Sequence, residues 1–125
     1  MKLAKLYVDA TPKSIAYVVD AGNTYYECHT IEKHTTNEAE YMALIEGLEY
    51  CIIEGYDLLQ IFSDSEIVVK QILGHYKVRN NLIPFHRKAT ELIAHFGIGT
   101  SITHIPGTEN PADYFSREGC KHEKE

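Results

Sequence analysis

Apolar and polar positions in the first third of the chain follow the pattern of strands. Residues 3–9 and 14–20 are rich in Val, Ile and Tyr, and a polar-aromatic run occupies residues 24–32. β-Branched and aromatic residues of this kind favour strands. The intervening residues 20–23, Asp-Ala-Gly-Asn, form a strong turn signal. This third of the chain therefore predicts three antiparallel strands in a meander.

The spacing of apolar residues then changes to that of a helix. Thr35-Thr36-Asn37-Glu38 has the pattern of a capping box with Thr35 as the N-cap. Beyond it apolar residues recur at near-helical spacing until Gly55: Met42, Ile45, Leu48 and Ile52. The pattern predicts a helix of about five turns that ends at the glycine.

A strand, a tight turn and a second helix are predicted next. Leu58–Phe62 is a short apolar run of strand length, and Ser63–Glu66 repeats the capping signature. Ile67–Leu73 has helical apolar spacing and precedes Gly74. Asp64 is therefore expected in the turn between the strand and the helix.

The last part of the chain predicts a helix, a strand and a short helix. Leu82–Phe96 has helical spacing, with Pro84 placed where a first turn tolerates it. Thr100–Ile105 alternates as a strand before a Pro-Gly break, and Asn110–Arg117 has room for a short helix only. The predicted order is βββαβαβα, an α/β fold with an antiparallel start and a parallel finish.

Composition limits the chain to one domain. With 125 residues, of which 44% are hydrophobic, it can bury one core. We expect this domain to cover residues 1–118 and residues 119–125 to be a disordered tail. No apolar run exceeds strand length and no small-residue cleavage site follows Met1, so neither a membrane span nor a signal peptide is predicted. A soluble, cytoplasmic protein is expected.

The chain has a formal net charge of −6, which is unusual for a protein that binds a polyanion. Bound divalent cations would reverse the sign of the charge locally, so the net charge does not exclude nucleic acid as a partner. It predicts weak binding without metal. No Cys-x-x-Cys pair and no H-E-x-x-H spacing occur, which argues against a zinc site.

Four carboxylates stand where a predicted strand ends or a predicted helix begins: Asp9, Glu40, Asp64 and Asp113. Each alone has an ordinary explanation, because acids are common in turns and in the first turns of helices. Strand ends and helix starts can nevertheless converge on one pocket. Four converging carboxylates would suit hard cations such as Mg²⁺ and Mn²⁺, and two such ions can stabilise both oxygens of a phosphodiester displacement.

Four segments resemble the motifs of a known family, and they occur in the same order along the chain as in that family. They are YVDATPKSIAYVV, TTNEAEY with the following ALIEGLEY, SDSEIVVKQILGHYKVRNN and HIPGTENPADYFSR. Together they resemble type 1 ribonuclease H over about residues 4–117. The first and last segments are most similar to retroelement and hepadnavirus-like ribonuclease H domains. The resemblance implies a ribonuclease H-like fold, with a five-stranded mixed sheet and helices on both faces.

The resemblance also implies an activity and its metal ligands. Members of the family cleave the RNA strand of an RNA–DNA hybrid and leave a 5′-phosphate and a 3′-hydroxyl. By position, Asp9, Glu40, Asp64 and Asp113 would be the catalytic carboxylates that hold two Mg²⁺ ions, with Mn²⁺ as the alternative. Asp9 would bridge the two ions.

Substrate contacts are implied in the same way. Asn37 matches an asparagine that reads the minor groove, where the 2′-hydroxyl distinguishes RNA from DNA. Thr35 matches a threonine near the DNA backbone, and Thr36 stands where the family commonly has a first asparagine. Lys77 belongs to a basic stretch that could follow the DNA strand. The basic residues of this stretch are Lys70, Lys77, Arg79, Arg87 and Lys88.

The chain departs from the family in two loops. Residues 10–14, Ala-Thr-Pro-Lys-Ser, replace a glycine-rich turn, so main-chain contacts near the metals are expected to differ. The loop over residues 107–112 is short and lacks the histidine that assists product release in many cellular members. His104 aligns with the end of the preceding strand instead. Slower turnover is the expected consequence.

Two alternatives remain open at this point. One is a related nuclease that acts on DNA or structured RNA with the same carboxylates. The other is a hybrid-binding or connecting module that has lost activity, although intact acids at all four motif positions argue against it. In each case an RNA–DNA hybrid or a related nucleic acid is the expected partner, and the protein is expected to be a monomer without membrane attachment.

Overall fold

Three antiparallel strands begin the chain in the computed structural model, which describes residues 1–117. They are β1 (Leu3–Thr11), β2 (Ser14–Ala21) and β3 (Asn23–Thr30). The predicted turn between the second and third strands is tight and has Gly22 at φ +95°, a backbone conformation that favours glycine. The meander predicted from the β-branched and aromatic runs and the turn signal is therefore confirmed.

Helix α1 (Thr36–Ile53) begins with the capping box that the sequence predicts. The Thr35 side chain accepts a hydrogen bond from the Glu38 amide at 3.2 Å, and the Glu38 side chain accepts one from the Thr35 amide at 3.1 Å. Two amides that the helix leaves unpaired are thereby satisfied. The helix ends before Gly55, whose φ is +78°.

Strand β4 (Leu58–Ser63) is followed by helix α2 (Glu66–Ile72), but the cap differs from the prediction. The N-cap is Ser65, whose side chain accepts from the Val68 amide at 3.3 Å. The predicted cap at Ser63 is wrong because this residue is still paired in the sheet. Its hydroxyl accepts from the Ser65 amide at 3.0 Å and so shapes the turn before the helix.

The remaining elements follow the predicted segments closely. A 3₁₀ turn at Asn80–Leu82 leads into α3 (Ile83–Ile93), which has Pro84 in its first turn as predicted. Strand β5 (Ser101–His104) and helix α4 (Pro111–Arg117) complete the described chain. Two helices, α2 and α3, thus lie between β4 and β5, so the predicted order of elements is one helix short.

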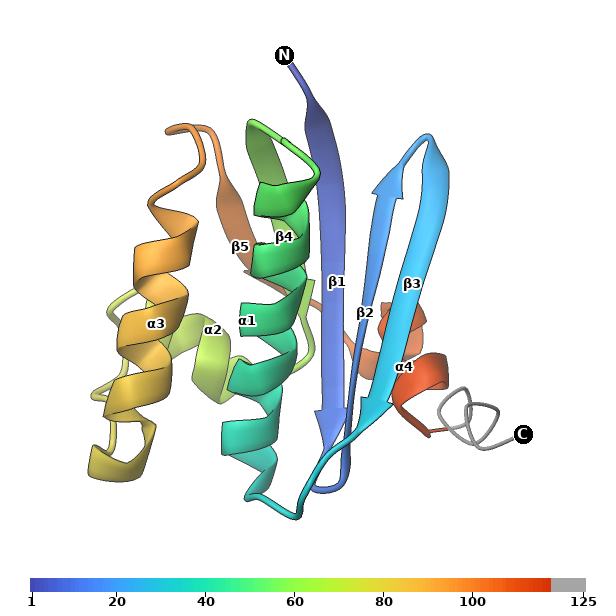
Figure 1. Ribbon diagram of the computed structural model, residues 1–125. Coiled ribbons are helices and arrows are strands. Elements are labelled where there is room, and N and C mark those ends of the chain that lie inside the picture. The colour runs from blue at the N-terminus through green and yellow to red at the C-terminus, as the bar shows by residue number, and fades with distance from the viewer. Residues whose placement is uncertain (118–125) are drawn as a thin grey trace.

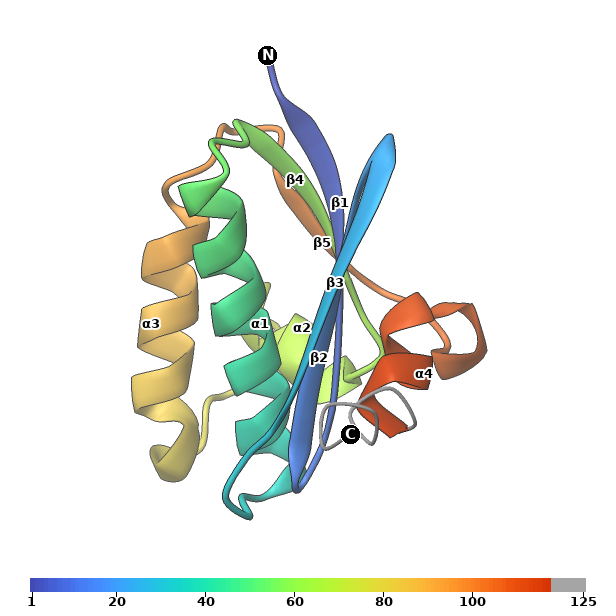
Figure 2. The same ribbon diagram turned by 45° about the vertical axis from the view of Figure 1, so that its right-hand side comes forward.

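The sheet has the strand order β3-β2-β1-β4-β5. β1 pairs antiparallel with β2 and parallel with β4, and β5 extends the parallel half. Helices α1, α2 and α3 cover one face and α4 packs on the other (Figures 1 and 2). The predicted five-stranded mixed sheet with helices on both faces is confirmed, and the helices leave the carboxyl ends of β1 and β4 accessible between them.

The main core lies between the sheet and helices α1 and α3, and a smaller cluster lies under α4. Side chains alternate along β1, so Leu6 and Val8 enter the main core while Tyr7 contacts the smaller cluster. The same alternation directs Asp9 toward α4. Among the described residues, no helix is long and apolar enough to cross a membrane. The predicted tail, residues 119–125, lies outside the described part of the chain.

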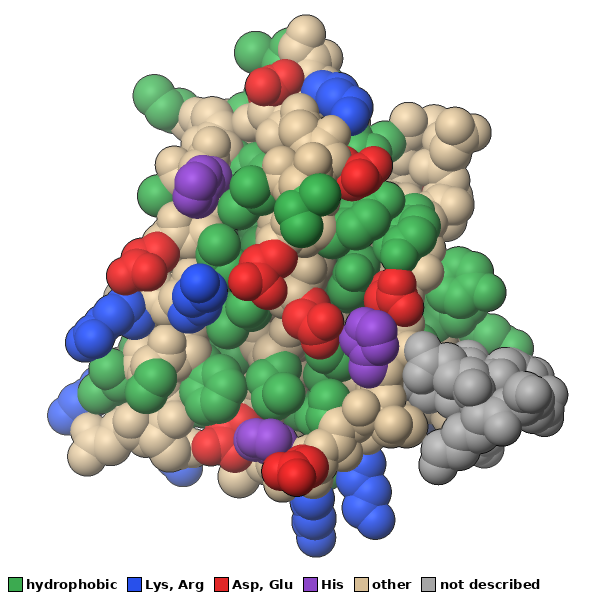
Figure 3. Space-filling view, in the orientation of Figure 1, with side chains coloured by type: hydrophobic (Ala, Val, Ile, Leu, Met, Phe, Trp, Pro, Cys, Tyr) green, Lys and Arg blue, Asp and Glu red, His purple; other side chains and the backbone are tan. Residues whose placement is uncertain are grey.

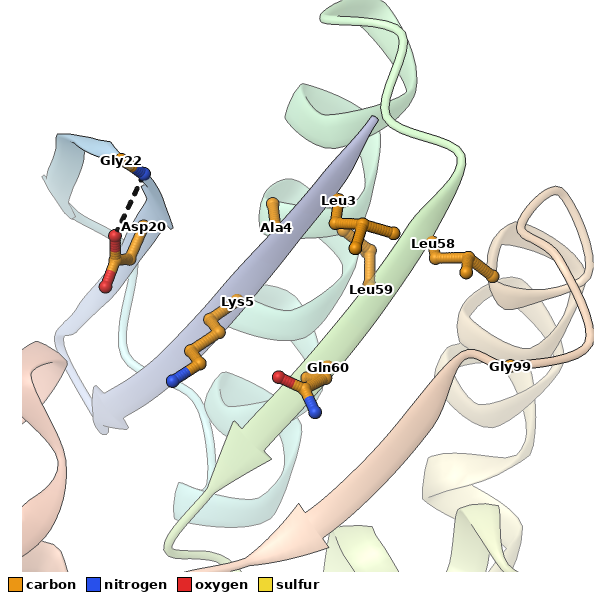
Figure 4. A pocket seen from close by; sticks show the side chains of 9 residues that line it. All are labelled: Leu3, Ala4, Lys5, Asp20, Gly22, Leu58, Leu59, Gln60 and Gly99. Atoms are coloured by element: carbon orange, nitrogen blue, oxygen red, sulfur yellow. Dashed lines mark hydrogen bonds between the residues drawn. The ribbon is translucent and has the colours of Figure 1, made fainter. Parts of the chain in front are cut away.

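A hollow of about 530 Å³ lies at the amino ends of β1 and β4 (Figure 4). Leu3 and Leu58 form part of its wall, and Lys5 and Asp20 face each other across the β1–β2 pair. Its two charged side chains, Lys5 and Asp20, have opposite signs, so the residues lining it include no cluster of carboxylates. The carboxylates predicted from the sequence lie at the other end of the same strands, so this hollow is not the candidate active site.

Candidate active site

Three of the four predicted carboxylates converge at the carboxyl ends of the central strands. One oxygen from each of Asp9, Asp64 and Asp113 lies within 4.8 Å of the others. The parallel register that pairs Val8 with Ser63 places the first two side by side. The third comes from the first turn of α4, on the opposite side of the sheet from α1. Residues separated by up to 104 positions in the sequence thus form one acidic cluster.

Glu40 reaches the same cleft from the other face of the sheet. It lies on the second turn of α1, is only 6% exposed, and has no hydrogen-bond partner for Oε1 among the described residues. All four carboxylates line one cleft of about 440 Å³. A buried carboxylate oxygen without a donor is costly in free energy, so a positive ligand in this cleft would satisfy it.

The electrostatics of the cleft reflect burial and repulsion between its carboxylates. Burial, followed by the charges of Asp9 and Asp64, raises the pKa of Glu40 to about 9. Burial also raises the pKa of Asp9 to about 7; the charge of Asp64 adds to the rise and a hydrogen bond from Ser116 opposes it. The donor set is all oxygen, which is the set that Mg²⁺ and Mn²⁺ prefer. The residues present therefore fit a divalent metal site.

Helix α4 is fastened to β1 immediately before the first carboxylate. The Asn110 side chain donates to the carbonyl oxygen of Val8 at 2.8 Å and accepts from the Ala112 amide at 3.1 Å. In the short loop ahead of it, a Cβ on Gly107 would come within 3.1 Å of Oδ2 of Asp64. This loop therefore packs closely against the acidic cluster.

Two residues of the site were not predicted from the sequence. Arg117 lines the cleft, and its Nε donates to Oδ1 of Asp113 at 3.0 Å. Ser116 is buried and donates to Oδ2 of Asp9 at 2.7 Å. The spacing of four between Asp113 and Arg117 on a helix could have indicated the first contact. No local signal could have indicated the second, which joins residues 107 positions apart.

The predicted substrate residues lie in different surroundings. Thr36 lines the acidic cleft, and Thr35 lines an adjoining hollow of about 520 Å³. Asn37 is half-buried in the first turn of α1. Lys77 is exposed, does not line the acidic cleft, and accepts a hydrogen bond on its carbonyl oxygen from Gln71 at 3.3 Å. The structure thus places the two threonines beside the carboxylates and leaves the lysine outside that cleft.

Positive charge is available next to the cleft. The hollow beside it is lined by Lys33 and His34 as well as by Thr35, together with one acid, Glu38. Lys and Arg side chains project beyond the end of the molecule where α1 begins (Figure 3). In the basic stretch predicted to follow the DNA strand, Lys70 lies 3.5 Å from Glu66, so part of its charge is neutralised within the protein.

His104 lies at the end of β5, as its alignment predicts, rather than in the loop before α4. Its Nε2 is 3.2 Å from the carbonyl oxygen of Asp64. The ring is exposed and contacts the main chain of the acidic cluster, not one of its carboxylates. This contact supports the turn that carries Asp64.

Replacement of Thr35 by alanine is expected to lower the free energy of unfolding by about 1 kcal/mol, because the capping box loses its side-chain acceptor. Urea denaturation measures the change. Thr35→Ser keeps the acceptor, so its free energy of unfolding should fall by much less than that of Thr35→Ala. Thr24→Ala on the exposed strand β3 is the matched control. Equal losses in the Thr35→Ala and Thr24→Ala variants would contradict the role of the cap.

The sequence profile of the family described as reverse transcriptase-like matches residues 14–119. The chain belongs to the reverse transcriptase-like family. The matched segment contains three of the four carboxylates that line the cleft, Glu40, Asp64 and Asp113, and the fourth, Asp9, lies just before it.

Relatives within this family and solved structures confirm the resemblance to type 1 ribonuclease H. The chain is 34% identical over 112 residues to a protein named ribonuclease HI from Halobacterium salinarum, which covers 86% of this chain and 56% of the relative. It is also 34% identical to a bifunctional protein of Mycobacterium tuberculosis, over 53% of this chain and 18% of that protein. The chain thus spans just over half the length of the first relative and less than a fifth of the second.

Two solved structures share the fold over nearly their whole length. The crystal structure of RNase H1 from Halobacterium salinarum has a TM-score of 0.87 and 29% identity, and the match covers 96% of this chain and 98% of that one. LC11-RNase H1, solved in complex with an RNA/DNA hybrid, has a TM-score of 0.81 and 26% identity, with coverage of 98% and 99%. The predicted ribonuclease H-like fold is confirmed by these similarities.

Proposed function

We propose that the chain is an endoribonuclease that hydrolyses the RNA strand of RNA–DNA hybrids. The observation that carries this proposal is the convergence of Asp9, Asp64 and Asp113 within 4.8 Å, with Glu40 in the same cleft. Four carboxylates share this cleft with a single basic side chain among the described residues, Arg117, so a divalent cation would be favourable there, and hydrolysis of a phosphodiester is the chemistry that such a cation would serve. Similarity to proteins named ribonuclease HI and RNase H1 supports the same activity.

The four carboxylates are proposed to hold two divalent cations, Mg²⁺ or Mn²⁺. When bound, these ions would supply Lewis-acid stabilisation of the phosphoryl oxygens and lower the pKa of the attacking water. The protein contributes fixed ligand positions, because two of the four side chains, Asp9 and Glu40, are almost fully buried. Their positions exclude bulk water from one side of the cleft. The proposed products carry a 5′-phosphate and a 3′-hydroxyl.

The hybrid is proposed to lie across the start of α1. Thr36 faces the acidic cleft, and Thr35 with Lys33 and His34 lines the adjoining hollow, where a backbone phosphate of the DNA strand would find hydroxyl and positive groups. Asn37 is proposed to contact the minor groove and sense the 2′-hydroxyl. Lys77, which is exposed, is proposed to meet the DNA backbone farther from the cleft.

Cleavage of an end-labelled RNA–DNA hybrid tests the proposal. With Mg²⁺, and then with Mn²⁺, the protein is expected to cut the RNA strand of the hybrid and to leave duplex DNA and duplex RNA intact. Asp64→Asn is expected to leave the hybrid uncut, since the charge that holds metal is lost while the shape of the side chain is kept. Gel separation of the labelled fragments measures cleavage of each duplex in each metal, for the natural chain and for the variant.

Two other results would contradict the proposal and name its replacement. Equal cutting of duplex DNA and hybrid would point to a related nuclease that does not recognise the RNA strand. Tight hybrid binding by folded protein, with no cleavage in either metal, would point to a binding or connecting module.

A further inference from the structure

Two buried serine hydroxyls connect helix α4 to the β1–β2 hairpin beside one carboxylate of the acidic cluster. The Ser116 hydroxyl donates to Oδ2 of Asp9 at 2.7 Å. The Ser14 hydroxyl donates to the carbonyl oxygen of Ser116 at 2.7 Å and lies 2.7 Å from the Thr11 hydroxyl. Ser14 and Ser116 are 6% and 3% exposed, so water does not compete for these bonds. These hydrogen bonds link the β1–β2 turn, α4 and the end of β1.

The direction of the Ser116 hydroxyl hydrogen follows from its distances. A serine hydroxyl has a single hydrogen to donate. Its oxygen lies 2.7 Å from the Asp9 carboxylate and 3.1 Å from the carbonyl oxygen of Asp113, one turn earlier in α4. Hydrogen bonds to an ionised acceptor are the shorter and stronger kind, so the hydrogen points to Asp9.

The bond from Ser116 to Asp9 ties helix α4, which carries Asp113, to strand β1, which carries Asp9. Asp113 lies three residues before Ser116 on α4, whereas Asp9 lies on β1. The charge of Asp64 repels the Asp9 carboxyl group, which is held by a backbone hydrogen bond at Ala10 and by the Ser116 hydroxyl. A donor held in place by its own helix and by Ser14 keeps one oxygen of Asp9 fixed against that repulsion.

We propose that Ser116 is a positioning residue for metal loading: its buried hydroxyl fixes the Asp9 carboxylate relative to Asp113, so that both stand at ligand spacing before a cation binds. The inference deepens the proposed function and rests on the metal site assigned there. It also accounts for the β1–β2 turn of this chain, in which Thr11 and Ser14 stand where the family has a glycine-rich turn. The Ser14 hydroxyl holds the main chain of Ser116, and the Thr11 hydroxyl in turn contacts that of Ser14.

Direct measurement of metal affinity tests the role of Ser116 without relying on activity. Isothermal titration of the metal-free protein with Mn²⁺ should show an affinity about 10-fold lower for Ser116→Ala than for the natural chain, the size of effect typical when a partner of a metal ligand is removed. Ser116→Thr, which keeps a hydroxyl, should restore affinity to within about 3-fold. Thr90→Ala is the control, because that hydroxyl bonds only within α3.

A hybrid-cleavage assay over a series of Mn²⁺ concentrations gives an independent readout. The concentration of Mn²⁺ needed for half-maximal rate should rise about 10-fold in Ser116→Ala, while the rate at saturating Mn²⁺ stays within about 3-fold of the natural chain. A serine that only supports folding would instead lower the active fraction and leave the metal midpoint unchanged.

Several outcomes decide the inference. The inference would be overturned if folded Ser116→Ala bound Mn²⁺ as tightly as the natural chain does. It would also be overturned if the natural chain bound no Mn²⁺. If Ser116→Thr does not fold, Ser14→Ala takes its place: it leaves the Ser116 hydroxyl but removes its support, and unchanged Mn²⁺ affinity in that variant would count against the inference. A wild type that binds Mn²⁺ but cuts no hybrid would refute the proposed function alone, and the affinity comparison would still decide the role of Ser116.

Discussion

Asp9→Asn is expected to abolish hydrolysis of the hybrid and, without divalent cations, to make the protein more stable at pH 8. The loss of activity follows from the position of Asp9 within 4.8 Å of Asp64 and Asp113, where it would contribute directly to metal binding. Metal ions supply several kcal/mol of transition-state stabilisation, and each 1.36 kcal/mol is tenfold in rate, so a loss of about 10³-fold or more is expected. Single-turnover cleavage at saturating enzyme measures it.

The gain in stability follows from the raised pKa of Asp9, about 7 against an ordinary value of 3.8, which burial causes first and the charge of Asp64 second. A carboxyl group with a raised pKa in the folded state binds more protons there than in the unfolded state. Its cost to stability is absent below pH 3.8, grows as pH rises, and is complete above pH 7. Asparagine carries no charge and can still accept the hydrogen bond from Ser116.

Thermal unfolding in a chelator measures this second half of the prediction. The midpoint of Asp9→Asn should lie about 5 °C above that of the natural chain at pH 8, and the two should coincide near pH 4. Glu91→Gln, which removes an exposed charge from α3, is the control and should shift neither stability nor cleavage. An Asp9→Asn variant that is active, or that unfolds at a lower temperature than the natural chain at pH 8, would contradict the assignment.

The elements of the fold were predictable because their signals are local. The β-branched and aromatic runs within residues 3–20 and the near-helical spacing after Thr35 each depend on neighbours in the sequence, and the capping box depends on two residues three positions apart. The cap of α2 was placed at Ser63 instead of Ser65 because the same four-residue signature occurs while the chain is still in a strand. Pairing with Val8, which extends β4 to Ser63, is a non-local contact that the signature does not contain.

The candidate site was predictable in part for a related reason. Asp9, Asp64 and Asp113 stand at element ends, and parallel pairing of β1 with β4 makes such ends meet. Glu40 could be distinguished from the other glutamates of α1 only by resemblance to a family, because its burial depends on which face of the helix meets the sheet. The bond from Ser116 to Asp9 depends on the packing of α4 against β1, and no sequence period carries that information.

Without divalent cations, stability is expected to fall as pH rises from about 5 to about 9, and saturating Mg²⁺ is expected to reverse the trend. Burial, then the charges of Asp9 and Asp64, raise the pKa of Glu40 from 4.5 to about 9. Above pH 4.5 the unfolded chain loses this proton while the folded chain retains it, so the folded state is penalised progressively until pH 9. The direction is opposite to ordinary acid denaturation, in which paired carboxylates stabilise the folded state as pH rises.

Glu40→Gln separates the contribution of this residue. The amide is uncharged and nearly the same shape, so the metal-free variant should show a much flatter dependence of unfolding temperature on pH. Glu49→Gln, on an exposed turn of the same helix, is the matched control and should retain the slope of the natural chain. An equal slope in Glu40→Gln and the natural chain would show that the buried carboxyl group does not cause the pH dependence.

Mg²⁺ should act on the same slope, because cations bind the ionised carboxylates and compete with protons for them. At 100 times its dissociation constant a ligand of the folded state stabilises it by about 2.7 kcal/mol, or roughly 8 °C in a protein of this size. The gain should be larger at pH 8 than at pH 5, since fewer protons must be displaced. Glu40→Gln and Asp9→Asn should each lose most of the gain at pH 8, whereas Glu49→Gln should keep it. A gain of the same size at both pH values would show that Mg²⁺ does not bind at the acidic cluster.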